Sequence, residues 1–252
     1  MLFIANDISD FNDMNNHSLT VVVTAYNEEK TIAEAITATN SALKKYVSDY
    51  EIIVVDDCSK DTTGRIADAV ARQNPRVRVF HNNPNRNIGY NMRLGVRMAR
   101  KEYCMIFVNA DSYLDEESFR GLFSAIGEKE FVLGYLAYYD RHWLRKFISW
   151  AFVKIMNFLF GFHIHYYNGP AIVKTEVWRT VPMTTDSFAY MAEVVTTLLK
   201  RKLTYIEVPV TFFSPERKGV NLPMLRRNVG RVVVAIISLF WRLNIKKELY
   251  AP

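Results

Sequence analysis

From residue 19 onward, short runs of β-branched and aromatic residues alternate with longer segments of helical periodicity. This alternation is typical of βαβ units built around a mostly parallel sheet. We expect strands at residues 19–24, 51–56, 77–81, 103–108, 131–138 and 204–213. Helices are expected at 30–46, 62–73, 90–101, 116–126 and 187–202, where apolar residues recur near i, i+3 and i+4. The pattern predicts an α/β domain with a mostly parallel sheet flanked by helices.

The length of 252 residues suits one large domain with a C-terminal elaboration. Residues 1–17 are rich in Asn and Asp and have no basic segment before an apolar stretch, so they are interpreted as a flexible arm and not as a secretory signal. The α/β domain is expected over 18–221. A basic amphipathic helix and tail are expected over 222–252.

The chain has a net charge of +6 and only two cysteines, Cys58 and Cys104. Two distant cysteines cannot form a disulfide framework or a metal knuckle, which favours a reducing, cytoplasmic location. The positive charge favours an anionic partner: nucleic acid, phosphate groups or a membrane surface. We do not expect a nucleic-acid partner, because no nucleic-acid-reading motif accompanies the charge. Three arginines that recur on one expected helix are interpreted as a solvated face: Arg93, Arg97 and Arg100.

Two longer apolar stretches lie at residues 143–162 and 229–243. Arg145, Lys146 and Lys154 interrupt the first, and the second has only ten residues, 232–241, without a charge. A membrane-spanning helix needs roughly 20 apolar residues. Both stretches are instead predicted to be amphipathic helices that lie on the inner face of a membrane, held by cations such as Arg226, Arg231 and Arg242. The alternative is that they pack on the sheet or on a second subunit.

Polar segments follow three of the expected strands, at residues 24–29, 56–59 and 109–111. Loops after neighbouring parallel strands leave one edge of the sheet, where α/β proteins bind ligands. Carboxylate and amide oxygens in Asn109-Ala110-Asp111 suit a hard divalent cation that carries a diphosphate. These segments, with Glu193 in a later helix, predict a nucleotide site. The pair His163 and His165 lacks a third ligand nearby and is not expected to bind metal.

Three strings together resemble the GT-A inverting glycosyltransferases of the family 2 type: Val21–Glu29, Val54–Thr62 and Asn109-Ala110-Asp111. Within that family the chain is most similar to the dolichol-phosphate mannose synthase and polyprenyl-phosphate glycosyltransferase branch. The resemblance implies a GT-A, Rossmann-like fold and a nucleotide-diphosphate sugar as donor. It also implies Mg²⁺ or Mn²⁺ as cofactor.

The resemblance also implies roles for individual positions. Thr24, Tyr26 and Glu28 would line the nucleotide pocket, and Val55 and Asp57 would meet the base and ribose. Asp111, with Asn109, would hold the metal beside Ala110, and Gly89 would open the helix before the metal-binding strand. Glu193 would lie in the acidic helix on the acceptor side. Candidates for binding the acceptor or its phosphate are Arg217, Lys218 and Arg145.

The chain departs from the family pattern at three places. Asn109 stands where an aspartate is usual, so either the metal affinity is expected to be weaker, or Asp111 and the diphosphate are expected to do more of the metal binding. The arginine usual after the glycine of the fifth strand is absent after Gly134. The arginine usual after the Ser-Gly turn is also absent, because Pro170 and Ala171 follow Asn168-Gly169.

Three functions are compatible with these features. The first is inverting transfer of a sugar from a nucleotide-diphosphate sugar to a polyprenyl phosphate at the cytosolic face of a membrane. The second is inverting transfer to a saccharide or protein hydroxyl with Glu193 as the base. The third is a non-enzymatic scaffold that binds a nucleotide sugar. A membrane subunit or a second copy of the chain is a further candidate partner.

Overall fold

The computed structural model describes residues 17–111, 113–138, 143–187, 189–213 and 222–250. The strands in this part of the chain are β1 (Ser18–Ala25), β2 (Asp49–Asp56), β3 (Val77–His81), β4 (Tyr103–Asn109), β5 (Tyr113–Leu114), β6 (Phe131–Tyr138), β7 (Ala171–Lys174) and β8 (Tyr205–Phe213). The helices are α2 (Ile32–Tyr46), α3 (Thr63–Gln73), α4 (Asn87–Met98), α5 (Glu116–Ser124), α6 (Trp143–Phe160), α7 (Thr175–Thr180), α8 (Tyr190–Lys200), α9 (Leu222–Phe240) and the π-helical segment η1 (Trp241–Lys246).

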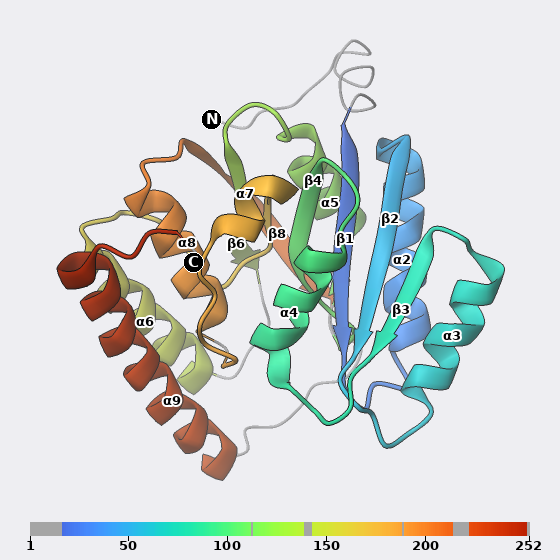
Figure 1. Ribbon diagram of the computed structural model, residues 1–252, viewed down its shortest axis with the longest axis horizontal. Helices are drawn as coiled ribbons and strands as arrows, with labels where there is room; N and C mark the ends of the chain where they lie inside the picture. The colour runs from blue at the N-terminus through green and yellow to red at the C-terminus, as the bar shows by residue number, and fades with distance from the viewer. Residues whose placement is uncertain (1–16, 112, 139–142, 188, 214–221, 251–252) are drawn as a thin grey trace.

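The eight strands described above form one sheet with the order β3-β2-β1-β4-β7-β6-β8-β5 (Figure 1). The first four strands in this order are parallel to one another, as the alternating pattern predicts. Beyond them β7 runs antiparallel to both β4 and β6, and β8 runs parallel to β6. The fold is therefore the predicted α/β sheet flanked by helices, with a mixed second half.

Helices cover both faces of the sheet, and each face has its own apolar core. One core packs α2, α3 and α5 against the sheet through residues such as Ile36, Leu43 and Phe119. The other core packs α4, α6, α7 and α8 against the opposite face, with Trp178 and Tyr190 fully buried in it. The strands between the cores are nearly continuous apolar runs because both of their faces are buried.

The structure corrects several expected boundaries. Helix α4 begins at Asn87, three residues earlier than expected, because the backbone N–H groups of Arg86 and Asn87 donate to the Asp57 carboxylate. It ends at Met98, and the next residues bond to the strands: the N–H of Arg100 donates to Glu51 Oε1 at 2.6 Å. Strand β5 and helix α7 were not expected, because each is short and depends on tertiary contacts.

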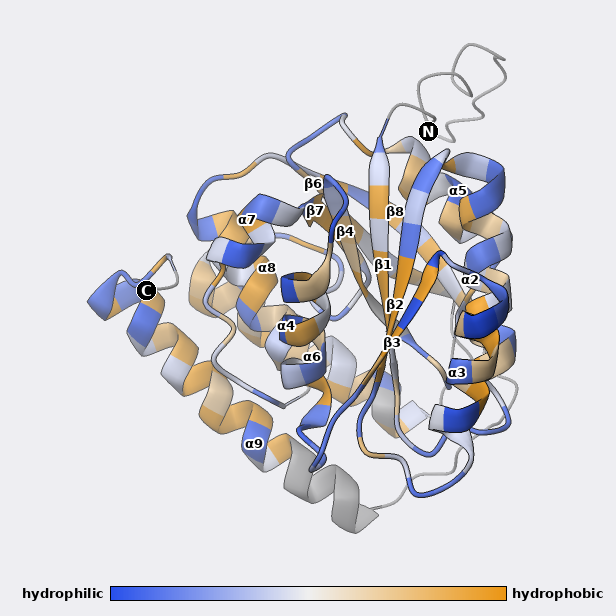
Figure 2. Cartoon of the chain, turned by 45° about the vertical axis from the view of Figure 1, so that its right-hand side comes forward, coloured by the Kyte–Doolittle hydropathy of each residue, from blue (hydrophilic) through white to orange (hydrophobic). Residues whose placement is uncertain are grey.

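Helices α6 and α9 form the outermost layer on one side of the molecule (Figure 1). Figure 2 shows hydrophobic and hydrophilic residues intermixed along the described part of α9. Several large apolar side chains on these helices are exposed, including Trp150 (58%), Phe158 (87%) and Val234 (68%). Among the described residues, none of the helices combines the length and the apolar character needed to cross a membrane.

The turn that contains Gly169 lies against β6 at very short range. The Gly134 N–H donates to the Pro170 carbonyl oxygen at 2.7 Å. A Cβ added at Gly169 would lie 1.7 Å from the carbonyl oxygen of Gly134, closer than two nonbonded atoms can approach. This backbone contact fixes how the segment after α6 enters β7, and it requires glycine at position 169.

Gly169→Ala is therefore expected to destabilise the fold by about 1–3 kcal/mol or more, as overpacking against rigid backbone does. Urea or guanidinium unfolding at equilibrium measures this change. Gly230→Ala is the matched control. Gly230 lies in helix α9, and a Cβ added there meets nothing within 4 Å. The control variant should be neutral or more stable, by up to about 1 kcal/mol. Equal stability of Gly169→Ala and the wild type would contradict the steric argument.

Candidate nucleotide-sugar site

Three parallel strands end at the same level and bring the candidate donor residues together. In the sheet register Thr24 lies opposite Val55 on one side and opposite Asn109 on the other. The Thr24 hydroxyl donates to Asn109 Oδ1 at 2.9 Å, and the Ala110 N–H donates to the Thr24 carbonyl at 3.0 Å. The end of β4 is therefore bonded to the end of β1, and the segment at 109–111 begins directly at the strand tips.

Asp111 and Asn109 are the residues that could contribute oxygen ligands to a metal. Both are half-buried, and a single hydrogen bond to Asn109 Oδ1 leaves this oxygen a second lone pair. The described residues contain no group of three or more His, Cys, Asp or Glu side chains able to hold an ion. The oxygen donors suit Mg²⁺ or Mn²⁺, but they fit such an ion only if a bound diphosphate supplies further ligands.

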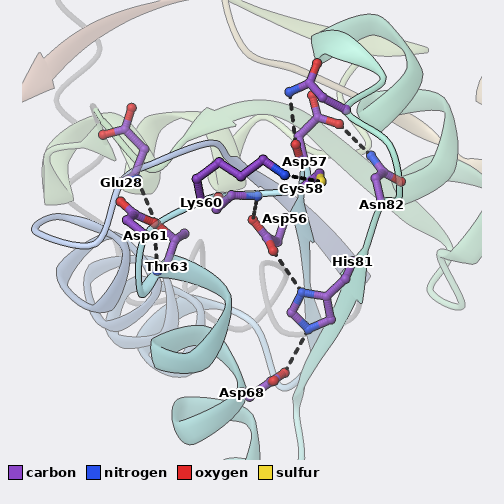
Figure 3. Close-up of polar contacts among 12 residues, drawn as sticks. Glu28, Asp56, Asp57, Cys58, Lys60, Asp61, Thr63, Asp68, His81 and Asn82 are labelled. Carbon is purple, nitrogen blue, oxygen red and sulfur yellow. Dashed lines mark hydrogen bonds and ion pairs between the residues drawn. The ribbon is translucent and has the colours of Figure 1, made fainter.

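The loop after β1 is held against the loop after β2 by its own polar groups. The Asn27 N–H donates to Ser59 Oγ at 3.0 Å, and the Lys60 N–H donates to Asn27 Oδ1 at 2.7 Å. The Glu28 N–H donates to Thr63 Oγ1 at 2.7 Å (Figure 3). Tyr26 is 47% exposed at the start of this loop, so its ring is accessible to a ligand.

Asp57 is a buried carboxylate whose oxygens are bonded within the protein. Its Oδ1 accepts hydrogen bonds from Asn82 Nδ2 at 2.8 Å and from the Arg86 N–H at 2.7 Å, and its Oδ2 accepts one from the Asn87 N–H at 2.9 Å. Figure 3 shows Asp57 directed at Asn82. Asp57 thus anchors the first turn of α4. Its predicted neighbour Val55 is fully buried in the apolar core, so contact of this side chain with a base stays a prediction.

Asp56 points to the other side of β2 and binds His81. The His81 Nδ1 lies 2.9 Å from Asp56 Oδ2, and its Nε2 lies 3.1 Å from Asp68 Oδ1 (Figure 3). The hydrogen bond with the Asp56 carboxylate raises the pKa of His81 above its usual value, and the Asp68 carboxylate adds to this effect. These contacts join the ends of β2 and β3 to α3.

Glu193 lies in the first turn of α8 and is almost completely buried. Its carboxylate accepts hydrogen bonds from the N–H groups of Thr184 and Thr185, at 2.9 Å and 3.1 Å, and from the Thr184 hydroxyl at 2.7 Å. The Arg242 guanidinium forms an ion pair with the same carboxylate. Both oxygens of Glu193 therefore already accept hydrogen bonds in this conformation.

A cavity of about 550 Å³ lies between α9 and the residues around Glu193. Asn87, whose N–H binds Asp57, lines one part of it, and Glu193 with Arg242 lines another. The remaining walls come from the loop 184–187 and from α9. The cavity therefore reaches the start of α4, but the strand-tip residues Thr24, Asn109 and Asp111 do not line it.

Two arginines have positions that differ from the expectation. Arg93 was interpreted as part of a solvated face, but its guanidinium forms an ion pair with Asp186 and donates to the Met183 carbonyl at 2.9 Å. Arg242 was assigned to the membrane surface, but its side chain is only 12% exposed and points inward to Glu193. Both corrections have the same reason, since each arginine lies next to an acidic side chain supplied by another part of the chain.

Some predicted residues lie outside the described part of the structure. Arg217 and Lys218 fall in the segment 214–221, and the side chain of Arg145 in α6 is likewise not described. Their roles at the acceptor phosphate stay predictions. Gly89 lies in the first turn of α4, as expected, and a Cβ there would lie 2.3 Å from the Thr185 carbonyl oxygen.

Sequence reasoning missed the residues that hold the site together. Asn82 and Asn87 support Asp57, while Thr184 supports Glu193. The Asn-rich turn after β3, residues 82–87, was a usable signal for Asn82, because asparagine side chains form hydrogen bonds in turns. Nothing in the local sequence indicated Thr184 or Arg242, because their contacts join distant segments.

Comparisons with known proteins agree with this architecture. Over 241 residues the chain is 27% identical to the undecaprenyl-phosphate mannosyltransferase of Micrococcus luteus, covering 91% of this chain and 96% of that protein. It is 31% identical over 119 residues to a dolichyl-phosphate beta-glucosyltransferase of Dictyostelium discoideum, covering 44% of this chain. The match spans 36% of the length of the Dictyostelium protein. For two other curated relatives the chain spans 40% and 29% of their length.

The fold also matches solved structures. The crystal structure of glucosyl-3-phosphoglycerate synthase from Mycobacterium tuberculosis, in complex with Mn²⁺, uridine-diphosphate-glucose and phosphoglyceric acid, superposes with a TM-score of 0.70. The match covers 91% of this chain and 83% of that chain at 14% sequence identity, so it shows a shared GT-A fold. The sequence pattern of "Glycosyl transferase family 2" matches residues 20–204. The chain belongs to glycosyl transferase family 2.

Proposed function

We propose that this protein transfers a sugar, with inversion, from a nucleotide-diphosphate sugar to a polyprenyl phosphate at the cytosolic surface of a membrane. The main support is the row of residues at the tips of β1, β2 and β4, where Thr24, Asn109 and Asp111 adjoin the loop after Asp57. In an open α/β sheet this edge is where nucleotides bind. The aromatic ring of Tyr26 is exposed at the same edge and suits stacking on a base.

The donor half of the proposal needs a divalent cation, for which Asp111 and Asn109 are the ligands on this chain. When bound, the cation would offset the negative charge that grows on the departing nucleotide diphosphate. The chain's own part is to hold the two oxygen ligands in place, and the Thr24 hydroxyl does this for Asn109. Asn109 brings no charge, so Asp111 supplies the negative charge of this pair.

The acceptor half of the proposal rests on the hydrogen bonds of Glu193 and on the names of two relatives. A phosphate acceptor is already ionised, with a second pKa of about 6, and needs no base. Glu193 accepts hydrogen bonds on both oxygens, which suits a carboxylate that positions the loop 184–187 better than one that must take a proton. The Micrococcus luteus and Dictyostelium discoideum relatives are named for transfer involving undecaprenyl phosphate and dolichyl phosphate.

The membrane part of the proposal rests on the outer helices α6 and α9. Their exposed apolar side chains lie beside exposed cations, among them Lys154 on α6 and Arg231 on α9. Aromatic and aliphatic residues edged with cations are typical of helices that lie in the interface of an anionic membrane. A lipid acceptor would then reach the enzyme in the plane of the membrane.

The test of the whole proposal is transfer itself. The protein is incubated with a panel of nucleotide-diphosphate sugars and a short polyprenyl phosphate, with Mg²⁺ or Mn²⁺, and the product mass and anomeric configuration are measured. We expect a polyprenyl-phosphate sugar of inverted configuration. A product on a saccharide or peptide hydroxyl would favour the second function. Nucleotide-sugar binding without any transfer would favour the scaffold.

Asp111→Asn should lower transfer by about 10²-fold or more, the range seen when one stabilising group is removed from an active site. The reason is the loss of the charged metal ligand. Initial rates as a function of Mn²⁺ concentration measure the effect, and the variant should need more metal. Asp49→Asn is the control: Asp49 is an exposed aspartate at the opposite end of β2 and should leave the rate unchanged. Full activity of Asp111→Asn would show that the Asp111 carboxylate is not a metal ligand.

Glu193→Gln separates the phosphate acceptor from the hydroxyl acceptor. If Glu193 positions the loop, transfer should fall by about tenfold or less and the pH profile should keep its shape. If Glu193 is a general base, the loss should be about 10²–10⁴-fold, and the acidic limb of the profile should change. Rates measured from pH 5 to 9 decide between these outcomes.

Binding to vesicles tests the membrane surface. The triple variant Lys146→Gln, Lys154→Gln and Lys247→Gln removes two exposed cations from α6 and one that directly follows η1. Each cation contributes about 1 kcal/mol near an anionic leaflet, so affinity for vesicles of anionic lipid should fall about a hundredfold at low salt. The control triple variant Lys44→Gln, Arg72→Gln and Lys129→Gln changes exposed cations away from α6 and α9 and should bind normally. Equal loss in both variants would argue against a specific face.

A further inference from the structure

Arg242 is a cation held inside the protein by the acceptor side of the site. It lies in η1, directly after α9, and its Nη1 donates to Thr184 Oγ1 at 2.7 Å and to Glu193. Its Nε lies 3.3 Å from Glu248 Oε2. The remaining Nη2 is buried and has no hydrogen-bond partner among the described residues. A buried arginine with this arrangement is costly unless the ion pair with Glu193 is kept.

Two sets of contacts connect Arg242 to the donor side: the first joins it to the loop 184–187, and the second joins this loop to α4. Glu193 and Arg242 together fix Thr184, and Glu193 also binds the N–H of Thr185. The loop then packs on α4, where the Gly89 N–H donates to the Asp186 carbonyl at 3.2 Å. A Cβ at Gly89 would lie 2.3 Å from the Thr185 carbonyl oxygen, so loop and helix are in direct backbone contact.

The first turn of α4 in turn determines the placement of Asp57. Three groups in the described part of the chain donate hydrogen bonds to this carboxylate, and two of them are the N–H groups of Arg86 and Asn87. Asn87 also lines the cavity that contains Glu193 and Arg242. A shift of the loop 184–187 would therefore move the first turn of α4, and with it Asp57 in the donor pocket.

We propose that Arg242 is a positioning residue for sugar transfer: through Glu193 it holds the loop 184–187 against α4, and so keeps the donor pocket in its binding geometry. This role rests on the proposed function, and it gives the C-terminal segment a part in the site besides the proposed contact with a membrane. In this role Arg242 acts on the loop and not on a reacting group. It acts through the Glu193 carboxylate and the Thr184 hydroxyl.

The chain offers a matched control for this proposal. Arg201 also joins the C-terminal segment to the body of the protein: its Nε donates to the Leu249 carbonyl at 2.8 Å, and its Nη1 donates to Thr180 Oγ1 at 2.9 Å. Within the described part of the chain, its side chain makes no hydrogen bond or ion pair with Glu193 or with the loop 184–187. Arg201→Gln therefore loosens the same terminal segment without removing the ion pair at the site.

Hydrogen exchange of the full-length protein tests the structural step without reference to activity. In Arg242→Gln, amide exchange should become faster in the peptides that cover residues 183–187 and 86–92, while β1, β2 and β4 keep their protection. Arg242→Lys, which retains the charge, should restore part of the protection. Arg201→Gln should leave both peptides unchanged. Unchanged exchange in Arg242→Gln, or an equal effect of Arg201→Gln, would overturn the proposal.

Steady-state kinetics tests the functional step. Arg242→Gln should raise the donor KM about tenfold, more than it lowers kcat, because the donor pocket is loosened while the reacting groups stay in place. The double variant Glu193→Gln with Arg242→Gln should be about as impaired as the more impaired single variant, since both residues act as one unit. Multiplying effects in the double variant would show that Arg242 acts independently of Glu193 and would overturn the proposal.

The two experiments separate failure of this inference from failure of the proposed function. If the wild type transfers no sugar, the proposed function fails, while the exchange experiment still decides whether Arg242 orders the loop and α4. If the wild type is active and Arg242→Gln matches it in donor KM, the proposed function stands and the positioning role is wrong.

Discussion

Two buried carboxylates, Asp57 and Glu193, set the geometry of the candidate site. A carboxylate removed from water is unstable unless donors replace the lost hydration, so each must collect hydrogen bonds from the chain around it. Asp57 obtains them from Asn82 and from the start of α4, and Glu193 obtains them from the loop 184–187 and Arg242. The hydrogen bonds to the two carboxylates therefore hold these loops in place, and the cavity lies beside Glu193 and extends to Asn87 at the start of α4.

The sheet positions the loops that contain the strand-tip residues. Strands β1, β2 and β4 are parallel and end together, so Ala25, Asp56 and Asn109 begin their loops at one edge. Because helices cover both faces, the strands are mostly apolar, and the polar segments of the candidate site follow at their tips. Family 2 membership and the GT-A fold fit this division, in which a rigid sheet carries a site made of loops.

The C-terminal segment combines two environments within a few turns. On α9 the side chains of Val234 and Ile237 are exposed, whereas Arg242 in the following π-helical segment is buried beside Glu193. Counting charges along the sequence placed Arg242 with the membrane-facing cations. The direction in which each side chain points depends on how η1 packs on α8, and that packing has no local signature.

The sequence by itself determined the order of the main strands and helices, the location of the strand-tip motifs and the family. These properties follow from local periodicity and from short strings such as Asn109-Ala110-Asp111, which need no knowledge of distant contacts. Only the tertiary structure decided that α4 begins at Asn87, that β5 pairs with β8, and that Arg242 and Arg93 face acidic partners. Each of these depends on a hydrogen bond or ion pair between segments far apart in the chain, and such pairings are set by the packing of the whole fold.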